Sequence, residues 1–456
     1  MIKFLEPESI AVIGASSDPR KGGYALFSNL KGSFSKRLYA VNPGGGEVCG
    51  LKALRSADEL PEGVDLAVVF VRAPLVPEIL EACGKRAIRR VMIQSAGFSE
   101  VGSEGVALQE RCLAIARGLG MRIWGPNCMG VVNGSTGMVA SFVRPEIWEG
   151  HLKPGPVSLV VQSGMLSAGF LFQILREGYF GLSKACSIGN KGDVNECDFL
   201  EYFAGDETTE VVGMYLESIA DAARFRNALS GLKKPVVVLK GGISRQGAQA
   251  AKSHTASLSG NALLADGFFR QTGVYRATDF FEMVDLIRAL VLWRGKIGGP
   301  RIGVLTFSGA SGIVAADHLD RRGMTLAHLS EDTIRTLRTV FPEWMEPMNP
   351  VDLWPAIERV GRRAYIVAVQ ALLKDPGVDG LYVHVYVDEA FLGDIVEALE
   401  SLRYADKPVA VWAIGDTRCF PALRSHVEPL GAPVFGEVAR GVLALSLALG
   451  PRPRPN

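Results

Sequence analysis

The chain has 456 residues, of which 48% are hydrophobic and 21% are charged, and its formal net charge is +1. Such a composition is typical of a folded globular chain with ample core, and the length favours about two to four domains. The near-zero charge provides no field that would attract nucleic acid or an anionic membrane, so we expect neither as a partner.

The seven cysteines are dispersed, without a CxxC pair or a Cys/His cluster. This usage fits a reducing cytoplasm and predicts no metal site. The first residues, MIKFLEPESIAVIGAS, run directly into a strand pattern, so we expect no signal peptide. No apolar run reaches the roughly 18 residues of a membrane span. We therefore expect a cytoplasmic location.

The first predicted element is a buried parallel strand at 9–13, which is followed by a small-residue turn and a helix near Gly22. Strand, turn and helix in this order are typical of a Rossmann-like unit. The dinucleotide fingerprint is incomplete, because its glycine positions hold Gly14, Ser16 and Pro19. A nicotinamide-dependent oxidoreductase stays an alternative. Lys21, at the start of the helix, suits a ligand with additional phosphate.

Strand patterns at 38–41, 65–71, 90–94 and 122–124 alternate with helical patterns and predict an open parallel sheet. In such a sheet the ligand lies over the carboxyl ends of the strands. Those ends hold Gly14, Ser16, Ser17, Asn42, Val71, Ser95, Ala96, Asn127 and Cys128. Each is consistent with an ordinary turn, and together they predict a binding crevice.

The segments VIGASSDPRKGG, VNPGGG, QSAGFSEVG and GPNCMG resemble the CoA-binding domain of the nucleoside-diphosphate-forming acyl-CoA synthetases. That family includes succinyl-CoA synthetase and ADP-forming acetate–CoA ligase. The resemblance implies that residues 1–147 form a CoA-binding Rossmann-like domain, with Lys21 and the strand-end residues around CoA. Gly44, Gly45 and Gly46 stand where the family often has a lysine for the CoA phosphate, and Arg72 is a candidate replacement.

A second strand–helix series covers 150–295. Its strand at 157–161 is followed by Ser163 and Gly164 at a helix start, where unpaired backbone amides favour an anion. The alternative is that Ser163 merely caps the helix. A later strand at 210–216 ends in Glu217, a usual place for a reactive carboxylate, although Glu217 is also suited to capping the next helix.

The stretch KGGISRQGAQAAKSHTASLSGN, residues 240–261, joins a buried strand to a predicted helix and carries His254. A helix start disfavours imidazolium and its amides hold anions, so His254 is a candidate phosphoryl carrier. A surface histidine beside a cap is the plainer interpretation. Glu217 would accept a hydrogen bond from the far ring nitrogen of His254.

The third series, at 300–450, repeats the second: VSLVVQSGMLSAGF and IGVLTFSGASGIVAA both read as strand, Ser-Gly turn and helix. We therefore expect two flavodoxin-like doubly wound domains. Their helix starts would face one phosphohistidine from opposite sides. The predicted phosphate-binding residues are Ser163, Gly164, Ser308, Gly309, Ser311 and Gly312. The tail at 451–456 is expected to be disordered.

GNKGDV, YLESI, KPVVVLKGG and SHTASLSG resemble the ligase domain of the same family. The resemblance places the family's phosphohistidine on His254 and its histidine-orienting glutamate on Glu217. The third domain resembles the one that succinyl-CoA synthetase carries on its other subunit. It departs from the family at Ser308, where an asparagine contacts the substrate carboxylate, and at Trp354, and these departures predict an altered acyl specificity. For Trp354, ordinary packing is the equally favoured alternative.

The chain shows no GxxxxGK[ST] loop and no further domain for a nucleotide. We therefore expect an α subunit, with ATP or ADP and Mg bound on an ATP-grasp β subunit in an α2β2 assembly, or a homodimer. The resemblance implies an acid–thiol ligase of the ADP-forming acetate–CoA ligase type, which interconverts acyl-CoA, ADP and phosphate with acid, CoA and ATP. The alternative is a non-catalytic CoA-binding sensor or scaffold. The acid, and ADP versus GDP, stay open.

Overall fold

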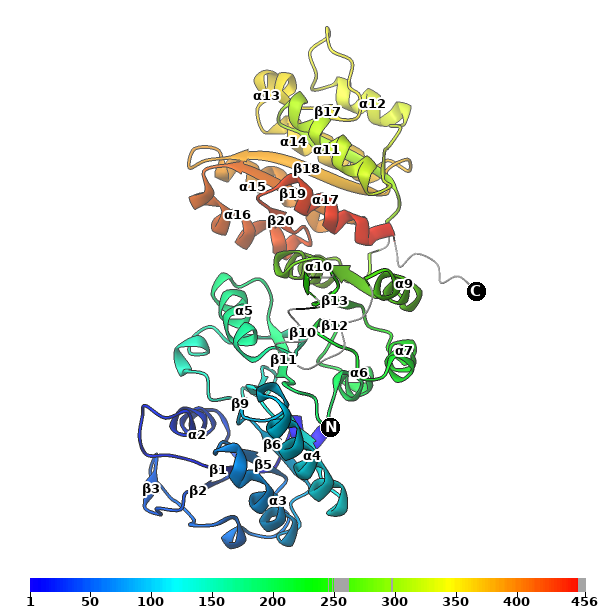
Figure 1. Cartoon of the computed structure of the whole chain (residues 1–456). Coiled ribbons are helices and arrows are strands. Elements are labelled where there is room, and N and C mark those ends of the chain that lie inside the picture. Colours follow the sequence, from blue (N-terminus) through cyan, green and yellow to red (C-terminus); the bar gives the residue numbers. More distant parts are fainter. Residues whose placement is uncertain (245, 248, 250–261, 297, 450–456) are drawn as a thin grey trace. The chain divides into compact units, whose positions relative to one another are not determined.

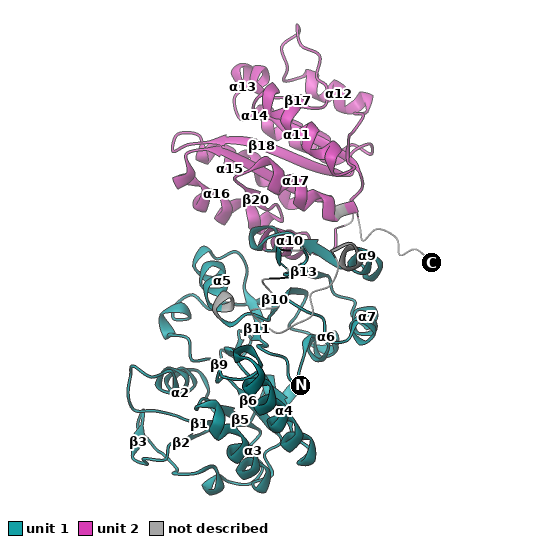
Figure 2. Ribbon diagram, viewed as in Figure 1, with its two compact units in different colours: residues 1–283 teal, residues 284–456 magenta. Residues whose placement is uncertain are grey.

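The computed structural model describes residues 1–244, 246–247, 249, 262–296 and 298–449 (Figure 1). His254 and the tail at 451–456 lie outside these ranges. The chain divides into two compact units, residues 1–283 and 284–456 (Figure 2). Each unit is built on parallel strands with helices on both faces, which confirms the predicted α/β class.

The first sheet of unit 1 is parallel and has the strand order β2-β1-β5-β6-β7. Its strands are β1 (Ser9–Ile13), β2 (Arg37–Val41), β5 (Leu66–Val69), β6 (Arg90–Ile93) and β7 (Arg122–Trp124). Its helices are α1 (Ile2–Leu5), α2 (Gly22–Ser33), α3 (Val76–Lys85) and α4 (Ser103–Gly118), and a small hairpin joins β3 (Glu47–Val48) to β4 (Leu51–Lys52).

Both faces of this first sheet are apolar, as expected for buried parallel strands. Along β1, Ile10 and Val12 pack into one core cluster with residues of α2. Ala11 and Ile13 pack into another cluster with residues of α3 and α4. The helices therefore cover both faces, and the loops at the carboxyl ends of the strands are the edge left open to a ligand.

The second sheet of unit 1 has the order β14-β13-β12-β10-β11-β8-β9. Its strands are β8 (Gly130–Asn133), β9 (Val139–Ala140), β10 (Pro154–Val161), β11 (Leu182–Ser187), β12 (Val211–Leu216), β13 (Val236–Lys240) and β14 (Tyr275–Ala277). Its helices are α5 (Gly164–Glu177), α6 (Glu196–Gly205), α7 (Ala222–Gly231) and α9 (Ala262–Thr272), and the first residues of α10 (Phe280–Trp293) also belong to unit 1, which ends at residue 283. Strands β8 and β9 are antiparallel additions at one edge.

Residues 130–140 therefore belong to the second sheet, although they precede the expected boundary at 147. The two sheets also share a core. Trp124, at the end of β7, donates from Nε1 to the carbonyl of Ser187 on β11 at 2.7 Å, and its ring contacts Phe199 of α6 at 4.8 Å. This shared packing explains why both sheets form one compact unit. The proposed division into domains at 1–147, 150–295 and 300–450 stays a prediction.

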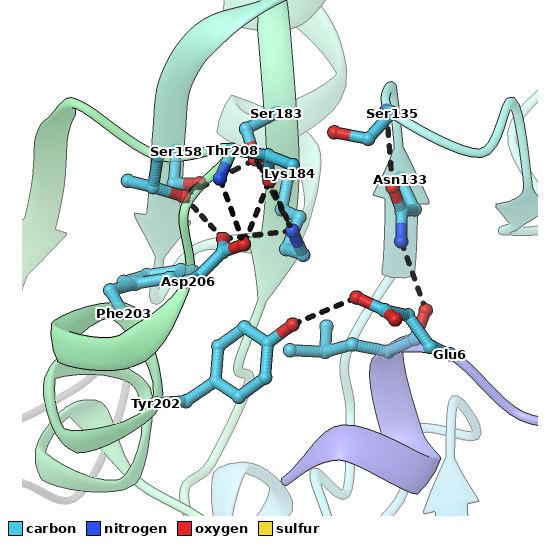
Figure 3. A network of polar contacts seen from close by, with 12 residues as sticks. Glu6, Asn133, Ser135, Ser158, Ser183, Lys184, Tyr202, Phe203, Asp206 and Thr208 are labelled. Carbon is cyan, nitrogen blue, oxygen red and sulfur yellow. Dashed lines mark hydrogen bonds and ion pairs between the residues drawn. The ribbon is translucent and has the colours of Figure 1, made fainter.

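A polar network holds α1 against the second sheet (Figure 3). Tyr202 of α6 donates to Glu6 at 3.0 Å, and Asn133 of β8 donates to the carbonyl of Leu5 at 3.0 Å. Beside them lies a buried ion pair, in which Lys184 Nζ is 2.8 Å from Asp206 Oδ2. Burial alone would raise the pKa of Asp206, but hydrogen bonds from Lys184 and neighbouring threonines lower it on balance.

Unit 2 has one six-stranded sheet with the order β16-β15-β18-β19-β20, and β17 also pairs with β15. Its strands are β15 (Arg301–Thr306), β16 (Thr325–Leu326), β17 (Val351–Asp352), β18 (Gly380–Val387), β19 (Val409–Gly415) and β20 (Val434–Phe435). Its helices are α11 (Gly309–Arg321), α12 (Glu331–Arg338), α13 (Trp354–Val360), α14 (Arg363–Lys374), α15 (Leu392–Leu399), α16 (Phe420–Val427) and α17 (Val438–Ser446).

A buried histidine lies inside unit 2. His384 of β18 is 1% exposed, and its ring stacks on Trp412 of β19 with centroids 4.1 Å apart. Its Nδ1 is 3.3 Å from the hydroxyl of Thr306, which itself donates to the carbonyl of Ser308 at 2.6 Å. Since that hydroxyl has used its hydrogen, Nδ1 is the donor in this contact. Burial lowers the pKa of His384 to about 4.

Replacing Asp206 with Asn should destabilise unit 1 by about 3–5 kcal/mol, because the Lys184 ammonium would stay buried without its counter-charge. Thermal melting measures the effect. The control is Glu8→Gln, which breaks the surface pair with Lys36 and should leave the melting temperature unchanged. Equal decreases of the melting temperature in the two variants would contradict a structural role for the buried ion pair.

Acid should weaken unit 2 through His384, because the unfolded chain binds this proton near pH 6.5 and the folded chain only near pH 4. The contribution of the neutral His384 ring to the free energy of unfolding is fully present above pH 6.5. It falls by about 3 kcal/mol as the pH drops to 4. Chemical unfolding at several pH values measures it. His384→Phe should remove this pH dependence of the free energy of unfolding, whereas the exposed control His426→Phe should leave the pH dependence unchanged.

Candidate functional site

A cavity of about 750 Å³ lies in unit 1 at the carboxyl ends of the first sheet. Its wall is completed by the start of α5, so both sheets of the unit contribute to it. Predicted site residues that line it are Gly14, Ser16, Lys21, Val71, Ser95, Ala96, Asn127, Cys128, Ser163 and Gly164. Most of the predicted crevice is therefore brought together in one cavity.

Two predicted residues do not line this cavity. Ser17 is exposed in the first loop. Asn42 instead ties two loops together, since its Nδ2 donates to the carbonyl of Ala15 at 2.7 Å and its Oδ1 accepts from the amide of Gly44 at 2.8 Å. Asn42 thus supports the loop after β1.

Close backbone packing shapes the loop after β1. Gly14 has a φ of +99°, and a Cβ there would lie 2.2 Å from the carbonyl oxygen of Phe70. A Cβ on Gly23, in the first turn of α2, would lie 2.1 Å from the carbonyl oxygen of Gly14. Only glycine fits both positions, so the loop lies tightly between α2 and the end of β5.

The cavity also has wall residues that sequence reasoning did not assign to the site. They are Gly22, Gly23, Phe70, Arg72, Gln94, Met129 and Phe142. Phe142 contacts Phe70 with ring centroids 4.9 Å apart, although the two lie far apart in sequence. Arg72, the candidate replacement for the missing lysine, lines the cavity, and both Arg72 and Lys21 are exposed cations of its wall.

Gln94 is a polar residue of the cavity wall, and its side-chain carbonyl oxygen is a hydrogen-bond acceptor available to a ligand. It is 3% exposed and donates from Nε2 to the carbonyl of Ala140 at 2.8 Å. Its Oε1 is buried and has no hydrogen-bond partner among the described residues. A buried carbonyl oxygen without a donor costs about 1–3 kcal/mol, and a ligand N–H in the cavity would offset that cost.

Cys128 is a buried wall residue whose thiol donates weakly to the carbonyl of Ile93, with the sulfur 3.4 Å from the oxygen. Burial raises the pKa of this thiol to about 12. Within the described ranges, no group of three or more His, Cys, Asp or Glu residues is arranged to hold a metal ion. The helices of those ranges also include none with the length and apolarity needed to cross a membrane.

Glu217 lies directly after β12 and is 6% exposed; it is not part of the cavity wall. Its backbone is held by buried side chains. Gln162 Oε1 accepts from the amides of Glu217 at 2.8 Å and of Ser218 at 3.2 Å. Lys240 Nζ donates to the carbonyl of Glu217 at 2.7 Å. The carboxylate therefore extends from a fixed piece of backbone.

The residues after Glu217 are held in the same way. Lys191 donates to the carbonyl of Ser218 at 2.8 Å and pairs with Glu196 at 2.9 Å. Glu196 in turn accepts from the amide of Ala220 at 2.6 Å. Burial lowers the pKa of Lys240, and the charge of Lys191 lowers it further, while Glu217 opposes the shift. Two buried lysines thus surround the peptide that carries the carboxylate.

The remaining predicted site residues are His254 and four residues of unit 2. His254 is outside the described residues. Ser308, Gly309, Ser311 and Gly312 lie at the start of α11 in unit 2. There, Ser308 donates from its amide to Thr306 at 3.0 Å, and a Cβ on Gly312 would lie 2.8 Å from the ring of Pro350. The predicted helix starts are confirmed, since Ser163 and Ser308 directly precede α5 and α11.

Two protein families match the chain. A CoA binding domain matches residues 8–134, and a succinyl-CoA ligase like flavodoxin domain matches residues 154–290. Both matches fall in unit 1. They agree with the Rossmann-like sheet and with the larger second sheet.

Curated relatives cover most of the chain. The α subunit of ADP-forming acetate–CoA ligase I from Pyrococcus furiosus is 35% identical over 96% of this chain and 95% of its own length. The α subunit of ligase II from the same organism is 38% identical over 86% of this chain and 83% of its own length. ADP-forming acetate–CoA ligase II of Archaeoglobus fulgidus is 34% identical over 96% of this chain, which spans only 65% of that longer protein.

A solved structure is similar over the whole chain. The dinucleotide-forming acetyl-coenzyme A synthetase 1 of Ca. Korarchaeum cryptofilum, in complex with phosphate and ADP, has a TM-score of 0.87 and 30% identity. The match covers 98% of this chain and 96% of that one.

Proposed function

The chain belongs to the nucleoside-diphosphate-forming acyl-CoA synthetases, and from this premise we propose that it is the α subunit of an ADP-forming acid–thiol ligase. The observation that carries the proposal is the similarity to two relatives named as α subunits, which this chain matches over 95% and 83% of their length. The chain spans 65% of a longer ADP-forming acetate–CoA ligase.

The proposed reaction is acyl-CoA + ADP + phosphate ⇌ acid + CoA + ATP. Phosphate attacks the thioester carbonyl, and the thiol of CoA leaves with a proton to give an acyl phosphate. A ring nitrogen of His254 then attacks phosphorus, the P–O bond to the acyl oxygen breaks, and the acid leaves. ADP takes the phosphoryl group from His254 to give ATP. Positioning and charge neutralisation supply most of the catalysis in such transfers.

The cavity of unit 1 supports CoA as the ligand. The tight glycine loop after β1 lets a ligand approach the backbone, and Lys21 and Arg72 supply positive charge for its phosphates. The apolar rings of Phe70 and Phe142 suit the less polar part of the molecule. At the other wall, Ser163 and Gly164 begin α5, whose amide groups favour an anion such as the attacking phosphate.

Glu217 is proposed to orient His254. Because side chains fix its backbone, little conformational freedom is lost when the carboxylate accepts a hydrogen bond from the ring. We propose that ATP or ADP with Mg binds on a partner ATP-grasp β subunit in an α2β2 assembly. We also propose that the helix start at Ser308–Gly309 in unit 2 contributes to phosphate binding.

Lys21→Ala and Arg72→Ala should each weaken CoA binding about tenfold, because each removes a charged contact with a phosphate. Calorimetric titration of the whole chain with CoA measures the affinity. Lys36→Ala, which removes a lysine of the first sheet that pairs with Glu8, is the matched control. Preferential binding of NAD over CoA would favour the oxidoreductase alternative and contradict the proposal.

His254→Ala should abolish labelling of this chain by radioactive ATP when the β subunit is present. Glu217→Gln should keep CoA affinity and slow labelling by a factor of about 10². The exposed control His426→Ala should be labelled at the normal rate. Absence of label in the unmodified chain would support a non-catalytic CoA-binding scaffold, and persistent label in His254→Ala would place the phosphoryl group elsewhere.

A further inference from the structure

Tyr215 lies two residues before Glu217 at the end of β12. Successive side chains of a strand point to opposite faces, so residues two apart share a face. The hydroxyl of Tyr215 donates to Oε1 of Glu217 at an oxygen–oxygen distance of 3.4 Å. The proposed orienting carboxylate therefore has a neutral hydrogen-bond donor on its own strand.

The ring of Tyr215 is fixed by aromatic packing. It contacts Phe280 of α10 with centroids 5.4 Å apart, and Phe280 contacts Phe170 of α5 at 5.1 Å. Burial, together with the nearby Glu217 carboxylate, raises the pKa of Tyr215 to about 12. The phenol consequently stays protonated at neutral pH and acts as a donor to the carboxylate.

The same hydroxyl lies against the loop that follows β13. A Cβ placed on Gly241 would be 2.9 Å from the hydroxyl oxygen of Tyr215 and 3.5 Å from the ring carbon that bears it. The amide of Gly241 also donates to the carbonyl of Leu216 at 2.9 Å, which fixes the loop at this point. Gly241 begins the segment that continues to His254. Tyr215 thus lies between the Glu217 carboxylate and the base of the His254 segment.

Charged groups from every neighbouring element also act on Glu217. Lys240 comes from β13, Lys191 from the turn after β11, and Glu196 from α6. Lys191 is paired with Glu196, and Lys240 donates to backbone carbonyls. These contacts hold the backbone, whereas the Tyr215 hydroxyl contacts the carboxylate itself.

We propose that Tyr215 is a positioning residue, whose hydroxyl orients the Glu217 carboxylate. This inference rests on the proposed function, because Glu217 is assigned there as the group that orients His254. It gives a role to a residue of the YLESI segment to which the sequence analysis assigned none, and it adds a consequence to the close approach of Gly241 to the hydroxyl.

Tyr215→Phe should slow phosphorylation of His254 by ATP and the β subunit about tenfold, because the hydrogen bond from the hydroxyl to the Glu217 carboxylate is lost. The maximal rate should fall while the half-saturating ATP concentration stays the same, because the hydroxyl contacts the carboxylate and not the nucleotide. CoA affinity should not change. Tyr202→Phe is a matched control, because its hydroxyl donates to the Glu6 carboxylate in the same unit.

Gly241→Ala provides a second test that does not depend on the phenylalanine variant. The added methyl group should displace the hydroxyl and slow phosphorylation in the unmodified background. In the Tyr215→Phe background the same change should have a much smaller effect, because the atom it meets is gone.

The outcomes separate the inference from its premise. A normal maximal rate in Tyr215→Phe, with the unmodified chain phosphorylated, would overturn the role of Tyr215. Equal effects of Gly241→Ala in both backgrounds would overturn it as well. An unmodified chain that is never phosphorylated would instead overturn the proposed function.

Discussion

Side chains, not secondary structure, hold the backbone that carries Glu217. Gln162 binds its amide and the next one, while Lys240 and Lys191 bind the carbonyls of Glu217 and Ser218. Buried backbone groups must find partners, and here each partner comes from a different element of the second sheet. A shift of any of these elements would therefore move the carboxylate, so the fold and the proposed site depend on each other.

The second constraint is the shared core of unit 1. Trp124 ends a strand of the first sheet, yet it bonds to β11 and packs on α6. Because one core stabilises both sheets, the loops of the first and the start of α5 form a single cavity. In the proposed reaction this is where a thioester and an attacking phosphate must meet, and a flexible link between the sheets would not keep them together.

The sequence was informative where local chemistry determines structure. Buried strands such as 9–13, and the Ser-Gly turns at Ser163 and Ser308, follow from apolar runs and cap residues, and the structure confirms them. Phe142 and Gln94 were missed because their roles depend on packing between segments distant in sequence. The histidine assignment rests on motif resemblance and the chemistry of helix starts, since His254 lies outside the described residues.

Cys128 has a consequence for acyl transfer. Any thioester bound in the cavity lies beside a protein thiol, and thiols exchange acyl groups with thioesters only as thiolates. Because burial raises the pKa of Cys128 to about 12, the thiol stays protonated at pH 7. In the proposed reaction this wall residue would therefore not accept the acyl group, which would stay available to phosphate.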